Sequence, residues 1–77
     1  MAARLGRVCR AARTAARPRL RMVDVAQCAG VSESTIHNFE HGRYWARNTD
    51  EIVAAYAQLC ETPERALWQA AIDLPGD

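Results

Sequence analysis

The chain has 77 residues, of which 49% are hydrophobic, and its formal net charge is +1. This length allows one domain at most, near the lower size limit at which a hydrophobic core stabilises a fold by itself. Because no apolar run is long enough for a membrane span or a signal-peptide core, we expect a cytoplasmic protein that binds no membrane.

Hydrophobic periodicity predicts an all-α domain. β-branched and aromatic residues never alternate over four or more positions, whereas apolar residues recur at helical spacing along the chain. Five helices joined by tight turns are predicted, at residues 3–16, 22–29, 33–41, 49–60 and 63–73. Together they form a single domain over residues 1–77.

The first helix carries one apolar stripe and ends at a proline. The stripe recurs at i, i+3, i+4, i+7 and i+11 and consists of Leu5, Val8, Cys9, Ala12 and Ala16. Pro18 ends the helix because a proline forces the preceding residue out of the α region. Arg13 lies at the edge of the stripe, where a half-buried charge needs a partner.

The second and third helices are separated by a tight turn. Gly30 suits the left-handed position that ends a helix, and Ser32 suits the N-cap of the next one. Gly42 ends the third helix. The apolar side of this pair consists of Val25, Ala26, Ala29, Val31, Ile36 and Phe39.

Caps also mark the starts of the fourth and fifth helices. Asn48 is the expected cap of the fourth helix, with Glu51 at the capping-box position. Thr62 is the expected cap of the fifth helix, with Pro63 at its first helical position. The residues expected in the core are Ile52, Val53, Tyr56 and Leu59 from the fourth helix, and Leu67, Ala70, Ala71 and Leu74 from the fifth.

Three cysteines, an odd number without CxxC spacing, occur in the chain. Cys9, Cys28 and Cys60 each fall on the apolar side of a predicted helix. We therefore expect buried free thiols in a reducing cytoplasm.

Charge is distributed unevenly along the chain. Residues 1–23 carry seven arginines and no acid, whereas residues 24–77 carry three arginines against nine acids. This split indicates one face for an anionic partner and another that repels it. Arginine without lysine suits phosphate binding and equally fits a GC-rich genome. An organellar transit peptide is a weaker interpretation of the basic start, because its removal would delete the first helix.

Polar side chains gather on one arc of the third helix, at about 100° per residue. They are Glu33, Ser34, His37, Asn38 and His41. A small helix with short hydrogen-bonding side chains suits the major groove of DNA.

Residues 37–41 also spell H-x-x-E-H, a zinc-peptidase motif. A chain this short leaves little room for a substrate cleft or a third ligand, so we expect no enzyme, no metal and no cofactor.

The segment VAQCAGVSESTIHNFEHGR, residues 25–43, resembles the helix-turn-helix of the lambda-repressor-like domains, also called the Cro/C1 or XRE type. The matching residues are Val25-Ala26, Gly30-Val31-Ser32, Ile36 and Phe39-Glu40-His41-Gly42. LGRVCRAAR, residues 5–13, is similar to the first helix of that family. Two features differ: the connection at residues 17–20 is longer than usual, and Met22 stands where relatives often carry a phosphate-binding glutamine.

The resemblance implies a sequence-specific DNA-binding transcriptional regulator, repressor-like and of bacterial or phage origin. Its third helix would enter the major groove of double-stranded DNA. Base contacts are expected from Glu33, Ser34, His37 and Asn38. Backbone contacts are expected from Arg19, Arg21, Thr35, His41, Arg43, Tyr44 and Arg47, with Arg19 or Arg21 replacing the missing glutamine.

The resemblance further implies a partly buried ion pair between Arg13 and Glu40. It also implies a homodimer on a two-fold operator. Trp68 and Ile72, together with Trp45, are candidate dimer contacts, and the alternative role for both tryptophans is to complete a small core. No small-molecule ligand is evident.

A second class of function is a protein-interaction module on the same fold, such as an antitoxin or adaptor with weak or no specific DNA binding. The low net charge favours it. The arginine-rich start and the polar third helix favour DNA binding, and binding to random DNA across a salt series distinguishes the two.

Overall fold

The computed structural model describes residues 1–44 and 48–75, and within these ranges the chain is all-helical. The helices are α1 (Ala2–Ala15), α2 (Met22–Ala29), α3 (Glu33–Glu40), α4 (Thr49–Leu59) and α5 (Glu64–Asp73). The all-α prediction is confirmed, and each helix end lies within one residue of its predicted position. None of the described helices is long and apolar enough to cross a membrane.

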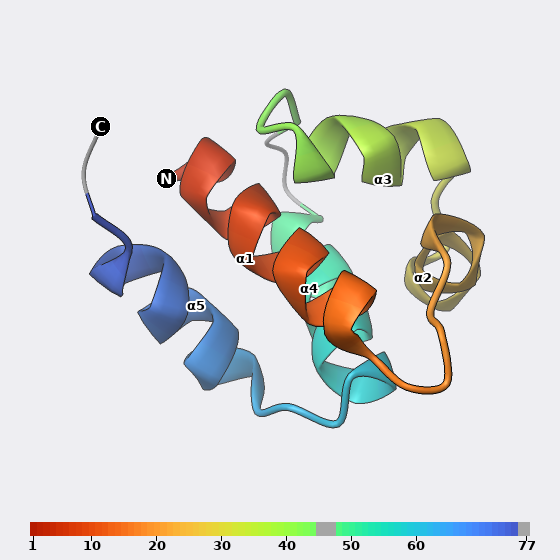
Figure 1. Ribbon diagram of the computed structural model, residues 1–77. Helices are drawn as coiled ribbons and strands as arrows, with labels where there is room; N and C mark the ends of the chain where they lie inside the picture. The colour runs from red at the N-terminus through yellow and green to blue at the C-terminus, as the bar shows by residue number, and fades with distance from the viewer. Residues whose placement is uncertain (45–47, 76–77) are drawn as a thin grey trace.

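Helix α1 is the central element of the domain (Figure 1). It contacts α3, α4 and α5, while α2 packs against α3 and α4. Helices α3 and α5 lie on different sides of α1 (Figure 1). The two surfaces of α3 and α5 that face solvent can therefore serve different partners.

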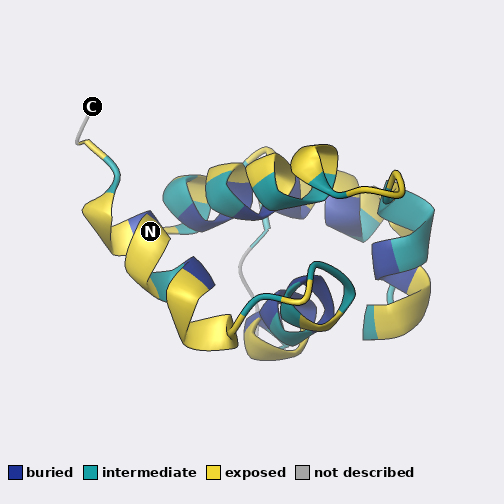
Figure 2. Ribbon diagram, turned by 60° about the horizontal axis from the view of Figure 1, so that its bottom comes forward, coloured by how far each residue is buried: buried dark blue, intermediate teal, exposed yellow. Residues whose placement is uncertain are grey.

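The buried sides of the helices turn toward a common core (Figure 2). The core consists of Leu5, Cys9, Val25, Ala26, Ile36, Phe39, Ile52, Val53, Ala55, Tyr56, Leu67 and Ala71. The expectation that Ala70 belongs to it is wrong, since Ala70 is exposed. Leu67 and Ala71 lie one turn apart and set the rotation of α5, which turns Ala70 outward.

The three cysteines differ in exposure, which corrects the expectation of three buried thiols. Cys9 is buried in the core, Cys60 is half-buried and Cys28 is exposed. Val25 and Ala26 set the inward side of α2, so Cys28 lies at its margin. There its thiol donates a weak hydrogen bond to Gln58 Oε1 at 3.8 Å.

Helices α1 and α3 approach each other closely at Gly6. A Cβ atom at Gly6 would lie 2.2 Å from the carbonyl oxygen of Phe39. Gly42, which follows α3 with a φ of +73°, lies so close to α1 that a Cβ there would be 2.7 Å from Ala3 Cα. The start of α1 thus packs directly on the backbone at the end of α3 and fixes the position of that helix.

The turn between α2 and α3 has the predicted construction. Gly30 adopts a left-handed conformation, with a φ of 74°, at the end of α2. Ser32 caps α3, because its Oγ accepts a hydrogen bond from the backbone N–H of Thr35 at 3.1 Å. The turn therefore satisfies the first backbone donors of α3 locally.

The predicted cap position of α4 is confirmed without its side-chain hydrogen bond, and the predicted cap of α5 is wrong. Asn48 occupies the N-cap position of α4, but its Oδ1 accepts a hydrogen bond from the Tyr44 hydroxyl at 2.7 Å, and no side-chain cap forms. Pro63, rather than Thr62, occupies the N-cap position of α5, because its ψ of 137° is extended. The Thr62 hydroxyl donates instead to the carbonyl of Cys60 at 3.1 Å.

Candidate nucleic-acid interface

The outer side of α3 is polar and exposed. Ile36, Phe39 and Glu40 face inward and are buried. The four residues expected to contact bases, Glu33, Ser34, His37 and Asn38, are all exposed. Within the described ranges, the side chains of Ser34 and Asn38 have no hydrogen-bond partner. The core therefore holds α3 by one side and leaves short polar groups of the other side available to a ligand.

Two histidines stack at the end of α3. The ring centroids of His37 and His41 lie 4.2 Å apart, with an interplanar angle of 30°. His41 Nδ1 donates to the backbone carbonyl of His37 at 2.8 Å, and both histidines are exposed residues. No cluster of three or more His, Cys, Asp or Glu side chains suited to a metal occurs among the described residues. The pair thus presents imidazole edges as hydrogen-bonding groups.

Arg13 and Glu40 form a bidentate ion pair beneath this surface. Arg13 Nε donates to Glu40 Oε2 at 2.6 Å, and Arg13 Nη2 donates to Glu40 Oε1 at 2.9 Å. The side chains are 11% and 1% exposed, respectively. The pair expected from the family resemblance is present in this structure, and it joins α1 to the last residue of α3.

Tyr56 completes this pair, a role that the sequence did not predict. Its hydroxyl donates to Glu40 Oε2 at 2.5 Å, which brings α4 into the cluster. Burial, followed by the hydrogen bond to Glu40, raises the pKa of Tyr56. The periodicity of α4 predicted Tyr56 only as a core residue. A buried tyrosine hydroxyl needs a partner, and that need was the available indication.

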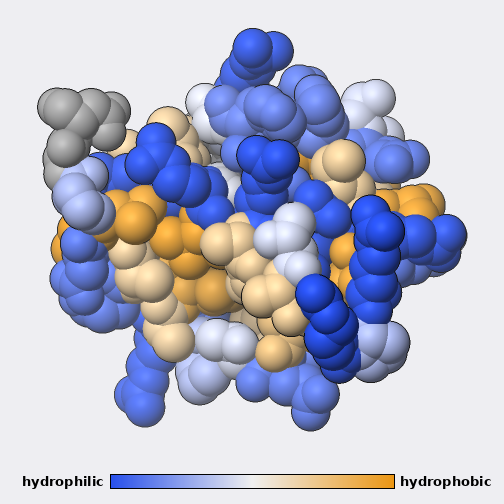
Figure 3. Space-filling view, viewed as in Figure 1, coloured by the Kyte–Doolittle hydropathy of each residue, from blue (hydrophilic) through white to orange (hydrophobic). Residues whose placement is uncertain are grey.

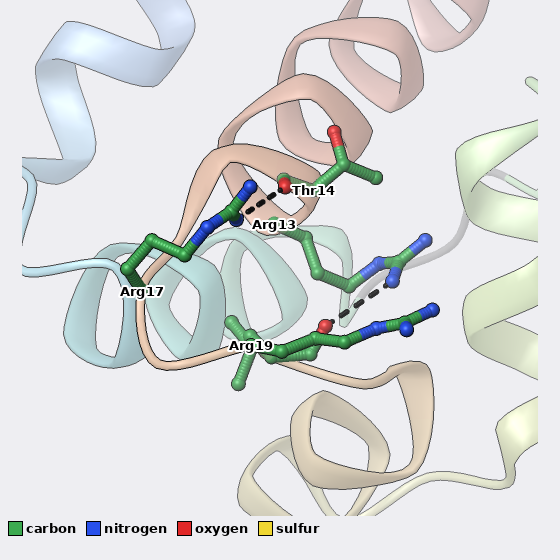
Figure 4. Close-up of a pocket in the computed structure, with 5 residues that line it drawn as sticks. Arg13, Thr14, Arg17 and Arg19 are labelled. Atoms are coloured by element: carbon green, nitrogen blue, oxygen red, sulfur yellow. Dashed lines mark hydrogen bonds between the residues drawn. The ribbon is translucent and has the colours of Figure 1, made fainter.

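Arginines surround the connection between α1 and α2, where the Arg17–Pro18 peptide bond is cis. Arg17 Nη1 donates to the carbonyls of Thr14 and Ala16 at 3.0 and 2.8 Å. Figure 4 shows Arg17 on one side of this region, with Arg13 and Arg19 on the other. Arg19 is exposed and has no hydrogen-bond or ion-pair partner among the described residues.

Arg21, one of the predicted backbone contacts, is already paired. Its Nη2 lies 3.2 Å from Asp24 Oδ1, and its backbone N–H donates to Asp24 Oδ2 at 2.9 Å. That backbone hydrogen bond, aided by the guanidinium, lowers the pKa of Asp24. Arg21 therefore offers less free positive charge than Arg19.

The remaining predicted backbone contacts lie in different environments. Arg43 and His41 are exposed beyond the end of α3. Thr35 is half-buried, and its hydroxyl hydrogen-bonds Ser32 Oγ at 2.9 Å. The hydroxyl of Tyr44 donates to Asn48 Oδ1 in this structure, so donation to a phosphate would require this hydrogen bond to break. Arg47 and Trp45 lie outside the described residues.

The candidate dimer residues lie on α5, away from α3. Ile72 is 56% exposed, whereas Trp68 is half-buried and packs against the core. Arg4 holds the end of α5 to α1, because its Nη1 donates to the carbonyl of Leu74 at 2.7 Å. The space-filling view shows apolar side chains at the surface near α1 and α5 (Figure 3). Trp68 therefore packs partly against the core, and the rest of its side chain lies at the exposed margin of α5.

Comparison with known proteins gives no match for this chain: no protein-family model, no curated protein and no solved structure. A function has therefore to be inferred from the described residues themselves. The relevant features are the exposed polar side of α3, the arginines between α1 and α2, and the buried cluster that holds these elements together.

Proposed function

We propose that this protein is a sequence-specific DNA-binding transcriptional regulator, repressor-like, with a lambda-repressor-like helix-turn-helix formed by α2 and α3. The observation that carries the proposal is the two-sided character of α3. Ile36, Phe39 and Glu40 anchor it in the domain, while Glu33, Ser34, His37 and Asn38 are exposed together. A helix held in this way can enter the major groove with its polar side toward the bases.

Each exposed side chain has a plausible role in that groove. An asparagine such as Asn38 can hydrogen-bond adenine N6 and N7 at once, and a glutamate such as Glu33 can accept from cytosine N4. Ser34 and His37 can also form hydrogen bonds with base edges. In this proposal Arg19 and Arg43 bind phosphates on either side of the groove, since both are exposed cations at the ends of the α2–α3 unit.

We further propose that the regulator acts as a cytoplasmic homodimer on a two-fold operator. A single domain of this size covers little of the groove, and in a dimer the binding free energies of two copies combine on one operator. Ile72 and the edge of Trp68 supply an apolar surface on α5, across α1 from the DNA-binding side. Sedimentation equilibrium, with and without operator DNA, measures the stoichiometry directly.

Selection from random double-stranded oligonucleotides tests the proposal. We expect enrichment of one short sequence, arranged as two inverted half-sites about 10 base pairs apart. Recovery of no common sequence, while the protein remains folded, would contradict specific DNA recognition.

A protein-interaction module is the second candidate. The observation in its favour is the acidic balance of residues 24–77, which hold nine acids against three arginines. In that case the domain would bind DNA weakly or not at all, and a basic partner would occupy the acidic surface.

A further inference from the structure

Two imidazole rings lie against each other at the end of α3. The ring centroids of His37 and His41 are 4.2 Å apart, and the rings are stacked with an interplanar angle of 30°. Both residues are exposed, so packing in the core does not impose this contact. Because an exposed side chain otherwise samples several rotamers, the stack needs a cause of its own.

One part of that cause is a hydrogen bond that fixes the His41 ring. Its Nδ1 donates to the backbone carbonyl of His37 at 2.8 Å. A neutral imidazole carries a single N–H, and here that N–H is used within the protein. Neutral His41 therefore has no N–H left for a phosphate, which disfavours the backbone contact expected of it from the sequence.

The backbone that carries His41 is also held in place. Its N–H donates to the His37 carbonyl at 3.2 Å, and the N–H of Arg43 donates to the Asn38 carbonyl at 2.8 Å. Between them, Gly42 lies so close to α1 that a Cβ atom there would be 2.7 Å from the α1 backbone. The His41 ring is thus a fixed surface, and the His37 ring rests on it.

We propose that His41 is a positioning residue for His37: its ring holds the His37 imidazole in one rotamer for contact with a base, and His41 itself contacts no phosphate. This role rests on the proposed function, in which His37 faces the bases. A side chain that is ordered before binding loses less conformational freedom on the DNA, so the stack raises the affinity. Base recognition by α3 then depends on a side chain that lies beyond the end of the helix.

NMR of the free protein tests whether His41 orders His37. In the wild type, the Hα–Hβ couplings of His37 should report one χ1 rotamer, and in His41→Ala they should report an average over several. His41→Phe is the matched variant, because it keeps an aromatic ring and removes the imidazole nitrogens. It should retain the single rotamer. Identical couplings in the wild type and His41→Ala would overturn the proposal.

Anisotropy with the duplex recovered by selection tests the consequence for DNA binding. His41→Ala should weaken binding by about threefold to tenfold, the contribution of one aromatic pair, and His41→Phe should restore most of the loss. In a double-mutant cycle, His41→Ala should cost nothing further once His37 is replaced by alanine. The salt dependence should stay unchanged in His41→Ala, whereas Arg43→Ala should reduce it by about one phosphate contact.

Equal losses in His41→Ala and His41→Phe, or additive losses in the cycle, would make His41 an independent contact and contradict the proposal. Failure of the wild-type chain to bind DNA would instead refute the proposed function, and with it the base contact of His37. The couplings of the free protein would still decide whether His41 orders His37.

Discussion

The most specific prediction of the proposed base recognition concerns Asn38. Its side chain is exposed on α3 and has no partner within the described ranges. We expect Asn38→Ala to cost about 1–3 kcal/mol of binding free energy on the selected sequence and little on random DNA. Fluorescence anisotropy with both duplexes measures the difference.

The control for Asn38 is Gln58→Ala, which removes an exposed amide from α4, outside α3 and outside the proposed dimer surface of α5. It should leave both affinities unchanged. Equal losses on selected and random DNA in Asn38→Ala would remove Asn38 from the base contacts.

Glu40 is the residue on which the buried cluster depends. It accepts hydrogen bonds from Arg13 and Tyr56 and is almost completely buried. Glu40→Gln leaves the Arg13 charge without its counter-charge, so the free energy of unfolding should fall by about 3–5 kcal/mol. Urea denaturation gives this value.

Tyr56→Phe provides the graded comparison, because it removes one donor and keeps the Arg13–Glu40 pair. It should cost about 1.5–3 kcal/mol, the range for a hydrogen bond to a charged group. Unchanged stability in both variants would show that the cluster does not hold the helices together.

Buried Cys9 and Tyr56 make the domain sensitive to alkali. Burial, with the nearby Glu40 carboxylate as the second cause, raises the pKa of the Cys9 thiol from 9.0 to about 12. The folded thiol retains its proton while the unfolded thiol loses it. Its stabilising contribution is therefore complete below about pH 9 and is lost as the pH rises toward about 12.

We expect the free energy of unfolding to fall in this window by up to about 1.4 kcal/mol per pH unit for each such group. Urea denaturation between pH 7 and pH 11 (roughly spanning the window) measures the slope. Cys9→Ala should reduce it, leaving the parts due to Tyr56 and Cys60, whose pKa values burial also raises. A slope that is the same in the variant and the wild type would exclude Cys9 as its cause.

At the scale of the elements, the contact between α1 and α3 decides where the polar surface lies. A methyl group at Gly6 meets the Phe39 carbonyl at 2.2 Å, and backbone cannot move aside cheaply. Gly6→Ala should therefore destabilise the domain by about 1–3 kcal/mol, although alanine favours an isolated helix. Thermal unfolding tests the sign, and a rise in melting temperature would contradict the close packing.

The helices themselves were predictable because their ends depend on local chemistry. Pro18, Gly30 and Ser32 act on their immediate neighbours, so the bounds of α1, α2 and α3 follow from the sequence. The caps at Asn48 and Pro63 were not predictable in the same way. The side chain of Asn48 can hydrogen-bond either the backbone of α4 or another side chain. The folded position of Tyr44 determines that Asn48 Oδ1 accepts from the Tyr44 hydroxyl.

The site was predictable in part for the same reason. Period 3.6 separates the exposed residues of α3 from buried Ile36 and Phe39, so the polar side could be deduced from the sequence. The role of Tyr56 and the close approach at Gly6 depend on how helices cross, which periodicity does not encode. The arrangement of Arg13, Arg17 and Arg19 around residues 16–21 likewise depends on the path of a connection that no repeat or cap determines.

At the scale of the whole molecule, the arginines of the first 23 residues and the acids of the later residues lie on different helices. Arg13, Arg17, Arg19 and Arg21 lie together where the end of α1 and the following connection meet the start of α2. The acids Asp50, Glu51, Glu61 and Glu64 are exposed on or beside α4 and α5. In the proposed function, the exposed arginines attract DNA and the acids of α4 and α5 repel it, which orients the encounter.

The ratio of affinities for the selected duplex and a random duplex, measured by anisotropy across a salt series, tests specific DNA recognition most directly. The proposed function predicts at least about 10³-fold tighter binding to the selected duplex, and a linear fall of log K with log salt for both. Equal affinities for the two duplexes, or binding that does not respond to salt, would contradict it.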